Sequence, residues 1–558
     1  MRVLLIYPRF PKTYWSFNRA LELLGRKVLL PPLGLITVAA LLPRDWELKL
    51  VDVNIRPVEP EEWAWADLVI ASAMLVQKRD LARQITLAKS HQLPVAVGGP
   101  FVSSTPEAPE LKHADFLILD EGEITIPLFV DAWRRGQTHG RFSAHGEKPD
   151  MSQSPIPRFD LLERQAYGMM AIQFSRGCPF QCEFCDIIVL YGRKPRTKTP
   201  GQILAELDRL LALGWRNEVF LVDDNFIGNK RNVKLLLEML RDWQEHHGHP
   251  FTFTTEASVD LASDEELMSA MEACHFRRVF LGIETPDQDS LLVSHKLQNT
   301  RSPLVDAVDR ITSHGIEVMA GFIIGFDGER PGAGERITAF VERTGIPLAM
   351  VGILQALPNT ALWRRLAKEQ RLIEHADAFD EGTITHLLNF VPSRPIHELA
   401  TEFLRAFAAL YDPISYMERV YRYCRKLATA RRRSLPRWNQ GGGLIRGLLT
   451  LCWRQGVRRN TRWLFWWRLL QMSLRYPQVV DEYLWLLMLN EHFIDYLAIT
   501  REQVESQLAY HDSEAMECLA GPLSGAEGAL SGGEVSSRPG QAAEPARLGP
   551  QRIPAGDL

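Results

Sequence analysis

The sequence is poor in cysteine. It holds seven cysteines in 558 residues, and none lies in the first 140. Thiols so few and so scattered exclude a disulfide framework. Three of them nevertheless crowd into eight positions, as Cys178, Cys182 and Cys185. This spacing suits a metal site in a reducing compartment better than it suits disulfides.

Long apolar runs and a large net charge are lacking as well. The most apolar early stretch, 28–42, is too short to span a bilayer and is interrupted by Pro31, Pro32 and Gly34. The first residues, MRVLLIYPRF, have the pattern of a β-strand and none of the features of a signal peptide. The formal net charge of -4 indicates no polyanionic partner for the chain as a whole. We therefore expect a cytoplasmic protein.

Residues 1–148 alternate short apolar runs with helical patterns such as 79–91. This alternation is typical of an α/β domain with a parallel, doubly wound (Rossmann-like) sheet. Ligands of such sheets lie beyond the carboxyl ends of the strands. The expected strands are 3–7, 48–53, 68–72, 95–98 and 116–119. Near their ends lie small and polar residues, as a site for a large flat ligand requires: Asp52, Asn54, Ser72, Met74, Gly98, Gly99, Asp120, Glu121 and Gly122.

A second alternating series occupies 165–395, after a linker-like segment at 149–157. Residues 396–512 have a helical pattern rich in Trp and Arg. Residues 513–558 are rich in Gly, Ala, Ser and Pro and nearly devoid of large apolar side chains, so we expect a disordered tail. The second series predicts a partial or complete β/α barrel, with strands at 171–175, 218–222, 251–256, 279–283, 317–325 and 349–355.

The cysteine cluster has the spacing C-x3-C-x2-C and follows the first expected barrel strand directly. A short loop of this kind brings three thiolates onto one face of an iron–sulfur cubane. Three ligands for four irons leave one iron open to a reactant. A structural zinc site without its fourth ligand, or a chance grouping of buried thiols, is the alternative. Four cysteines have no partner at ligand spacing and are expected to be bystanders: Cys274, Cys424, Cys452 and Cys518.

The stretch FSRGCPFQCEFCDII, residues 174–188, resembles the radical S-adenosylmethionine (SAM) superfamily. The resemblance implies a 4Fe–4S cluster on Cys178, Cys182 and Cys185, with SAM chelating the open iron and Phe184 near its adenine. The stretch VDDNF at 222–226 departs from the Gly-Gly-Glu turn of many members. Helix capping or a salt bridge is the alternative role for each carboxylate that follows. Further SAM contacts are implied at Asp223, Asp224, Asn225, Glu256, Gly282 and Glu284.

The N-terminal domain resembles that of the cobalamin-binding subclass, at 33–35, 52–54, 98–100 and 120–123. A nucleotide or flavin binder is the alternative, but the G-x-G-x-x-G turn after the first strand is missing. The sequence has no Asp-x-His-x-x-Gly motif, so we expect no histidine ligand on cobalt. Because the cofactors carry the chemistry, we assign no acid–base catalytic residue. The resemblance implies cobalamin contacts at Asp52, Asn54, Ser72, Met74, Gly98, Gly99, Glu121 and Gly122.

Acidic residues are missing from one long span. Between Glu418 and Asp481 there are fifteen Lys or Arg residues and no Asp or Glu. Two interpretations explain this basic span equally well: an interfacial membrane contact, or a pair of packed helices with a solvated basic face. RNA binding is a third and weaker interpretation. Tryptophans are interspersed with these arginines: Trp438, Trp453, Trp463, Trp466 and Trp467.

This span and residues 174–200 resemble the branch that contains the hopanoid C-2 methylase and the bacteriochlorophyll side-chain methylases. The branch implies methylation of an unactivated carbon of a lipid-like, hopanoid or tetrapyrrole-type substrate, with a flavodoxin- or ferredoxin-type electron donor and peripheral membrane contact. We expect no nucleic acid partner. A cobalamin-dependent cyclase or rearrangement enzyme is the alternative enzyme, and a cobalamin carrier or sensor is the alternative outside catalysis. A tRNA methylthiotransferase is disfavoured, because the N-terminal domain has no cysteine.

Overall fold

The computed structural model describes residues 1–373, 387–430 and 443–519. The chain divides into two compact units, Met1–Leu508 and Ala509–Leu558, and the sheets and the site lie in the first. The tail from 520 onward, for which disorder is expected, and Trp438 lie outside the described residues. Among the described helices, none is long and apolar enough to cross a membrane.

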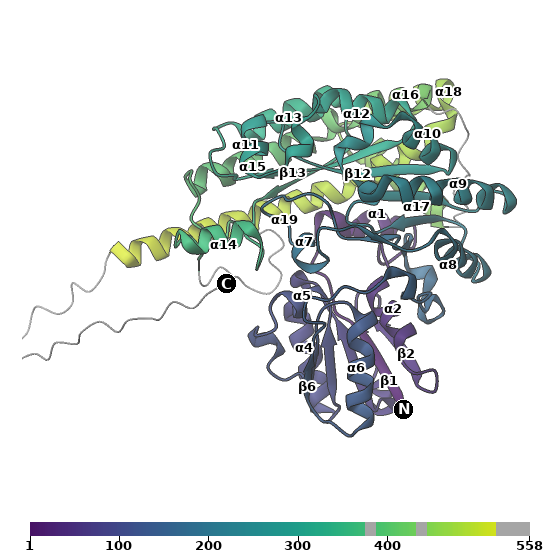
Figure 1. Ribbon diagram of the computed structural model, residues 1–558. Coiled ribbons are helices and arrows are strands. Elements are labelled where there is room, and N and C mark those ends of the chain that lie inside the picture. The colour runs from purple at the N-terminus through teal and green to yellow at the C-terminus, as the bar shows by residue number, and fades with distance from the viewer. Residues whose placement is uncertain (374–386, 431–442, 520–558) are drawn as a thin grey trace, which may run out of the picture. The chain divides into compact units, whose positions relative to one another are not determined.

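The first sheet is parallel throughout, in the strand order β2-β1-β3-β4-β5-β6 (Figure 1). This is a doubly wound order, with its switch point between β1 and β3, and it confirms the expected α/β class. The expected strands are present, and a sixth short strand, β6, was not expected. The strands are β1 (Arg2–Tyr7), β2 (Glu47–Asp52), β3 (Leu68–Ser72), β4 (Val95–Gly98), β5 (Phe116–Ile118) and β6 (Gly140–Phe142).

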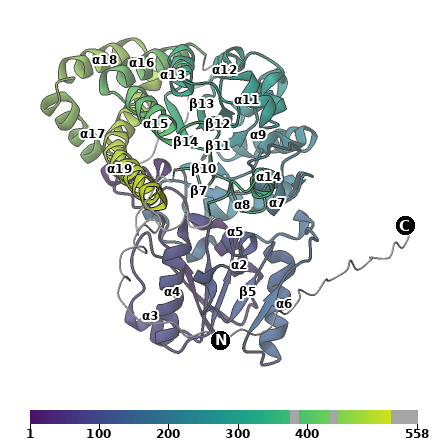
Figure 2. The same cartoon turned by 90° about the vertical axis from the view of Figure 1, so that its left-hand side faces the viewer.

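Helices cover both faces of this sheet (Figure 2). Successive residues of a strand point to opposite faces, so Leu4 and Ile6 join one core while Val3 and Leu5 join another. One core takes residues of α3 (Pro60–Trp65), α4 (Lys78–Ser90) and α5 (Pro100–Ser104). The other takes residues of α2 (Leu33–Leu41) and α6 (Gly122–Arg134). Burial on both faces explains why these strands are continuous apolar runs in the sequence.

The second sheet is also parallel, with the order β14-β13-β12-β11-β10-β7. The strands follow one another in chain order, and no pairing between β7 and β14 occurs among the described residues, so this is a partial barrel. Helices α8 (Pro200–Ala212), α9 (Lys230–His246), α10 (Glu265–Ala273), α12 (Leu304–Ser313) and α13 (Ala333–Thr344) connect them. The strands are β7 (Met170–Ile172), β10 (Glu218–Leu221), β11 (Thr252–Ala257), β12 (Phe276–Glu284), β13 (Glu317–Ile324) and β14 (Leu348–Ile353).

Strand β12 begins at Phe276, earlier than expected. Arg277 and Arg278 have the sequence pattern of a polar loop, but both are buried in the strand. Arg278 donates to Glu218 at 2.8 Å and to Glu482 at 2.5 Å, and Arg277 donates to Glu482 at 2.5 Å. All four side chains are almost fully buried. Removing one member of such a network would leave uncompensated buried charge, which costs about 3–5 kcal/mol.

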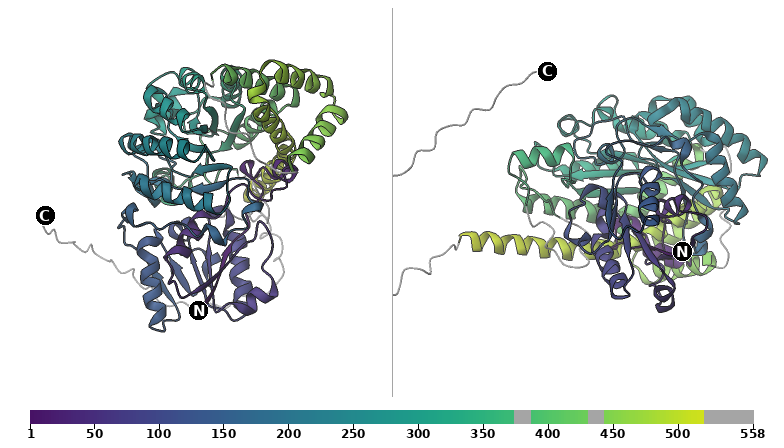
Figure 3. Two further views of the ribbon diagram at one scale, coloured as in Figure 1. Left: turned by 90° about the vertical axis from the view of Figure 1, so that its right-hand side faces the viewer. Right: turned by 60° about the horizontal axis from the view of Figure 1, so that its bottom comes forward.

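The C-terminal part is helical, as expected. It contains α15 (Ile396–Leu410), α16 (Pro413–Ala430), α17 (Gly443–Trp453), α18 (Arg462–Arg475) and α19 (Val480–Leu519) (Figures 2 and 3). Helix α19 continues to Leu519, so residues 513–519, for which disorder was expected, are helical instead. Its residue Phe493 stacks on Tyr14 with ring centroids 4.8 Å apart, and the Tyr14 hydroxyl lies 2.5 Å from that of Tyr411. The loop after β1 is therefore packed against the C-terminal helices.

Candidate functional site

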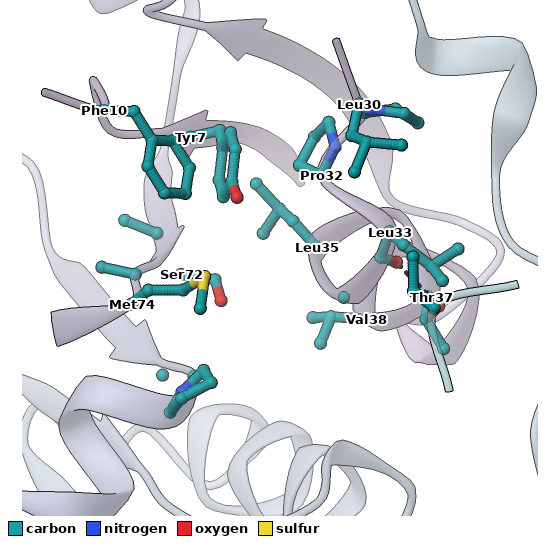
Figure 4. Close-up of a pocket in the computed structure, with 18 of the residues that line it drawn as sticks. Tyr7, Phe10, Leu30, Pro32, Leu33, Leu35, Thr37, Val38, Ser72 and Met74 are labelled. Carbon is teal, nitrogen blue, oxygen red and sulfur yellow. Dashed lines mark hydrogen bonds between the residues drawn. The ribbon is translucent and has the colours of Figure 1, made fainter. Parts of the chain in front are cut away.

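A cavity of about 950 Å³ lies at the carboxyl edge of the first sheet. One wall is formed by the segments after β1, β3, β4 and β5 and by the start of α2; Figure 4 shows Tyr7, Ser72 and Met74 around it. The opposite wall comes from the barrel domain, from residues next to the cysteine loop: Gln173, Arg176, Asp186, Ile187, Val189, Leu190, Tyr191, Val222 and Asp224. The cavity thus lies between the two predicted cofactor sites.

Backbone forms part of the cavity surface. Gly99 has φ +96, and a Cβ there would lie 2.6 Å from Ser72 Oγ, so only glycine suits this position. A Cβ on Gly34, the second residue of α2, would meet no atom within 4 Å. The cavity is also large and largely apolar, so the residues present fit a broad, flat cofactor.

Seven of the eight residues proposed as cobalamin contacts line the cavity; Asp52 does not. Asp52 is buried and accepts hydrogen bonds from the Asn54 backbone N–H at 2.9 Å and from the Tyr167 hydroxyl at 3.0 Å. Burial raises the pKa of its carboxyl. Asp52 therefore holds the loop after β2 instead of facing the cavity. The seven are Asn54, Ser72, Met74, Gly98, Gly99, Glu121 and Gly122.

Glu121 lines the cavity, but its carboxylate is occupied by two arginines of the barrel domain. Arg176 donates to one oxygen at 2.8 Å and Arg196 to the other at 2.7 Å. Arg176 also forms two hydrogen bonds of 2.9 Å with Glu123. These charge-assisted pairs join the first sheet to the segment that carries the cysteines. No histidine is found among the described residues that line the cavity.

The three cysteines lie in the loop between β8 (Ser175–Arg176) and β9 (Arg196–Thr197), two short antiparallel strands. Amide groups approach two of the sulfurs: Asn225 Nδ2 lies 4.0 Å from Cys178 Sγ, and Gln298 Nε2 lies 3.6 Å from Cys182 Sγ. Burial raises the pKa of the Cys178 thiol, and it raises the pKa of Cys185 to about 12. Metal binding therefore has to displace protons from both.

No three His, Cys, Asp or Glu side chains are arranged for a single metal ion in the part of the chain that the structure describes. In a zinc site all the sulfurs lie about 2.3 Å from one ion. A cubane instead spreads its thiolates over separate iron atoms.

The turn after β10 mainly supports the cysteine loop. Asp223 is buried and accepts backbone hydrogen bonds from Phe174 at 2.7 Å and Ser175 at 2.9 Å. Asp224 accepts from the Gly177 backbone at 2.7 Å and also lines the cavity. Burial raises the pKa of Asp223 to about 7 and that of Asp224 to about 6. Of the two, Asp224 is the one placed to contact a ligand in the cavity.

The remaining proposed SAM residues come from β11, from β12 and from the cysteine loop. The side chain of Glu256, on β11, has no hydrogen-bond or ion-pair partner among the described residues, and burial raises its pKa to about 7. Glu284, at the end of β12, pairs with Lys296 at 2.5 Å. A Cβ on Gly282 would lie 2.7 Å from Lys296 Nζ, so the strand leaves room for this pair. Phe184 packs on Phe326, with ring centroids 5.8 Å apart.

Sequence reasoning missed Lys296. Burial opposes its charge, but Glu284 and the nearby Cys182 hold the pKa of its ammonium above the ordinary value. Its Nζ also lies 5.8 Å from the centre of the Phe184 ring. A lysine in the segment SHKLQN gives no sequence signal of such a position; only Glu284, already singled out, could have pointed to a cationic neighbour.

A parallel partial barrel with three cysteines after its first strand defines a class of enzyme, and comparison with known proteins identifies it. Residues 172–340 match the Radical SAM superfamily, and residues 360–506 match a domain of unknown function, DUF4070. The chain is 56% identical over 513 residues to the uncharacterized methyltransferase sll1242 of Synechocystis, covering 91% of this chain and 94% of the relative. It is 36% identical to the hopanoid C-2 methylase of Rhodopseudomonas palustris, covering 89% and 93%.

The chain therefore belongs to the radical SAM superfamily, and it is an enzyme that transfers methyl groups. Its fold also resembles two solved structures. The cobalamin-dependent SAM radical enzyme OxsB has a TM-score of 0.57 at 16% identity, covering 94% of this chain and 82% of that one. The radical SAM methyltransferase TsrM from Kitasatospora setae, with cobalamin and a [4Fe-4S] cluster bound, has a TM-score of 0.53 at 17% identity, covering 66% and 78%.

Proposed function

We propose that this enzyme is a cobalamin-dependent radical SAM C-methyltransferase that acts on an unactivated carbon of a lipid-like substrate. The observation that carries the proposal is the cavity, because its two walls come from the glycine-rich edge of the first sheet and from the cysteine segment. In this assignment residues 1–148 bind cobalamin, 165–395 bind the cluster and SAM, and 396–512 form the helical region.

The cobalamin would rest on the glycine side of the cavity. Gly98 and Gly99 let the cofactor approach the backbone, and Ser72, Asn54 and Met74 would border it. Because no described lining residue is a histidine, we expect no histidine on cobalt.

Cys178, Cys182 and Cys185 would hold the 4Fe–4S cluster. When bound, the cluster supplies the electron that cleaves SAM, and cobalamin supplies the methyl group. The chain's own side chains bind these cofactors and orient them. Lys296 offers a cation and Glu256 a carboxylate to the two ends of a zwitterionic ligand, while Phe184 offers a ring to its base. Asn225 and Gln298 donate toward the sulfurs.

The substrate would occupy the apolar end of the cavity. Its walls there are Trp15, Leu29 and Leu30, and Trp15 packs against Phe280 of the barrel strand β12 with ring centroids 5.3 Å apart. Such a lining binds by excluding water and offers few polar contacts. It suits a polycyclic, hopanoid-type skeleton, and the 36% identity to the hopanoid C-2 methylase supports the same class.

An electron donor of the flavodoxin or ferredoxin type would reach the cluster through the cysteine loop. Arg193 and Lys194 are exposed beside this loop, and the Arg193 guanidinium lies 3.5 Å from the Pro179 carbonyl oxygen. Neither forms an ion pair among the described residues. Two unpaired cations suit the acidic surface of such a donor.

The test is an anaerobic incubation of reconstituted enzyme with methylcobalamin, SAM, a chemical reductant and either a hopanoid or a bacteriochlorophyllide. We expect a product heavier by one methylene unit, with S-adenosylhomocysteine and 5′-deoxyadenosine formed together, and only with the hopanoid. Cys182→Ala is the inactive control, and Cys274→Ala is the matched active one. 5′-Deoxyadenosine without S-adenosylhomocysteine would instead indicate a cyclase or rearrangement enzyme.

A further inference from the structure

A large apolar surface lies on the solvent side of α17, of the turn that follows it and of α18. Its members are exposed to between 43% for Trp466 and 75% for Trp463 and Leu474. Ordinary soluble surfaces rarely collect so many large apolar side chains in one stretch. We call this surface the tryptophan face, and it consists of Leu449, Trp453, Val457, Trp463, Trp466, Trp467, Leu470 and Leu474. Figure 2 shows α17 and α18 at the outer edge of the helical region.

Helix α18 is apolar on two sides. Phe465 and Met472 are fully buried against the protein. Trp463, Trp467, Leu470 and Leu474 are spaced by four, three and four residues, which aligns them along another side of the helix. A helix that packs only against its own protein needs a single apolar stripe. The second stripe therefore indicates a partner.

The unpaired charges next to this face are all positive. Arg458, Arg462 and Arg475 are exposed and form no ion pair within the described residues. Their neighbours Arg454 and Arg459 instead pair with Glu491, at 3.6 and 3.1 Å, and so serve the fold. Residues 419–480 contain no Asp or Glu, so no acidic side chain of that span offsets these arginines.

We propose that the tryptophan face docks the enzyme onto an anionic lipid surface. Indole rings and leucines enter the headgroup level while the arginines pair with lipid phosphates. A second copy of the chain is a poorer partner, because two copies of this face would place arginine against arginine. The matched region, 360–506, is a domain of unknown function, and lipid docking is the function we assign to it.

The face is connected to the cavity through α1 (Asn18–Leu23). A Cβ on Gly447 of α17 would lie 2.7 Å from the Leu23 carbonyl oxygen, so the two helices are in backbone contact. The segment 9–18, which supplies residues of the cavity wall, ends at the first residue of α1. Docking by α17 and α18 thus places the apolar end of the cavity close to a source of lipid. This part of the inference rests on the proposed lipid substrate, whereas the docking itself does not.

The experiment is co-sedimentation of the full-length protein with vesicles, without SAM or substrate, so methyl transfer has no influence on the result. We expect binding to phosphatidylcholine mixed with phosphatidylglycerol, weaker binding to phosphatidylcholine alone, and partial release by salt. The fluorescence maximum of the tryptophans should shift to shorter wavelength on binding.

Two sets of substitutions separate the charge from the apolar contact. Arg458→Gln with Arg462→Gln should weaken binding to the anionic vesicles about fivefold for each arginine. Trp463→Ser, Leu470→Ser and Leu474→Ser together should weaken it by ~tenfold or more. The matched controls are Arg134→Gln with Arg135→Gln, two exposed arginines at the carboxyl end of α6, and Leu235→Ser, a half-exposed leucine of α9. These controls should bind as the unmodified protein does.

Three results would overturn the proposal. The first is that the unmodified protein stays in the supernatant when it is mixed with anionic vesicles at low salt. The second is that the triple serine variant binds these vesicles as tightly as the unmodified protein does. The third is a dimer in solution that the same triple variant converts to monomers, because the face would then join two copies. SAM cleavage with a chemical reductant, measured in parallel, verifies that each variant is folded.

Discussion

The carboxyl edges of the two parallel sheets have opposite chemistry. The first sheet ends in glycines and small side chains, with Gly98 and Gly99 beside Ser72. The barrel ends in ionisable side chains that are buried or half-buried: Glu256, Asp224 and the pair of Glu284 with Lys296. This difference in side chains explains how two sheets of the same parallel topology can bind two different kinds of ligand. A large flat ligand needs side chains to be absent, whereas a small zwitterion needs charges placed in advance in a medium of low dielectric constant.

The largest effect should come from the cluster loop. Replacing Cys178, Cys182 or Cys185 by Ala should abolish the 4Fe–4S absorbance and SAM cleavage, because each thiolate holds its own iron. Cys274→Ala is the matched control, since the Cys274 thiol is buried and donates to the Leu237 carbonyl oxygen. A complete cluster in any of the three variants would contradict the assignment of the barrel edge.

The proposed cobalamin site at the carboxyl edge of the first sheet is tested by adding a side chain that occupies the cavity. Gly34→Leu adds a side chain where a Cβ meets no protein atom within 4 Å, so the fold should tolerate it. The leucine would occupy cofactor space, and cobalamin affinity should fall about ten- to a hundredfold, as judged by equilibrium dialysis. Gly201→Leu is the control, because Gly201 is also the second residue of a helix, is equally open, and lies away from the cavity. Unchanged cobalamin binding in Gly34→Leu would place the cofactor elsewhere.

The proposed docking of an electron donor at the cysteine loop is tested by reversing the charge of two exposed residues there. Arg193→Glu with Lys194→Glu should slow cluster reduction by reduced flavodoxin about tenfold at low salt, because opposite charges steer such encounters. Reduction by a small chemical reductant should stay the same. Equal slowing with both reductants would mean that the substitutions damage the cluster loop and not a docking surface.

The smallest effect concerns the stability of the ligand-free protein. Burial raises the pKa of Glu256 from its ordinary 4.5 to about 7. Protonation of this carboxyl therefore favours the folded state, so its contribution is complete below about pH 4.5 and is lost as the pH rises through about 7. Glu256→Gln stays neutral and should be more stable than the unmodified protein above about pH 7, by on the order of 1 kcal/mol.

The same variant should bind SAM more weakly if Glu256 contacts it, giving a gain of stability with a loss of function. Thermal unfolding of both proteins at pH values on either side of 7, with SAM binding in parallel, measures the two effects. A stability difference that does not change with pH would show that Glu256 is not protonated in the folded protein.

Local patterns predicted most of the fold and part of the site. The strand ends of the first sheet lead to the cavity because parallel strands share one carboxyl edge, and the position of Gly98 and Gly99 follows from that rule alone. Asp52 lies at the same edge and still faces away from the cavity, because Tyr167 and Asn54 take its hydrogen bonds. The bonding partner Tyr167 is 115 positions away in the sequence, and no local pattern announces it.

The errors in the barrel have the same origin. Arg277 and Arg278 look like surface residues until Glu482 from α19 and Glu218 from β10 neutralise them. Lys296 resembles a loop lysine until the fold brings it to Glu284. These features of the barrel depend on contacts across the fold. Strand β6 of the first sheet was missed for a different reason, because three residues, Gly140–Phe142, carry too little periodicity.

The pairing of Arg278 with Glu482 also determines when the barrel can be completed during synthesis of the chain. The two residues are 204 positions apart, and a ribosome that adds about 5–20 residues per second needs about 10–40 s to make the intervening chain. During that interval the cysteines of the loop have already emerged, while the amino ends of the barrel strands still lack the helix that neutralises their arginines. Iron and sulfide delivered in that interval would therefore meet an unfinished barrel, and we expect cluster insertion to follow the synthesis of Glu482.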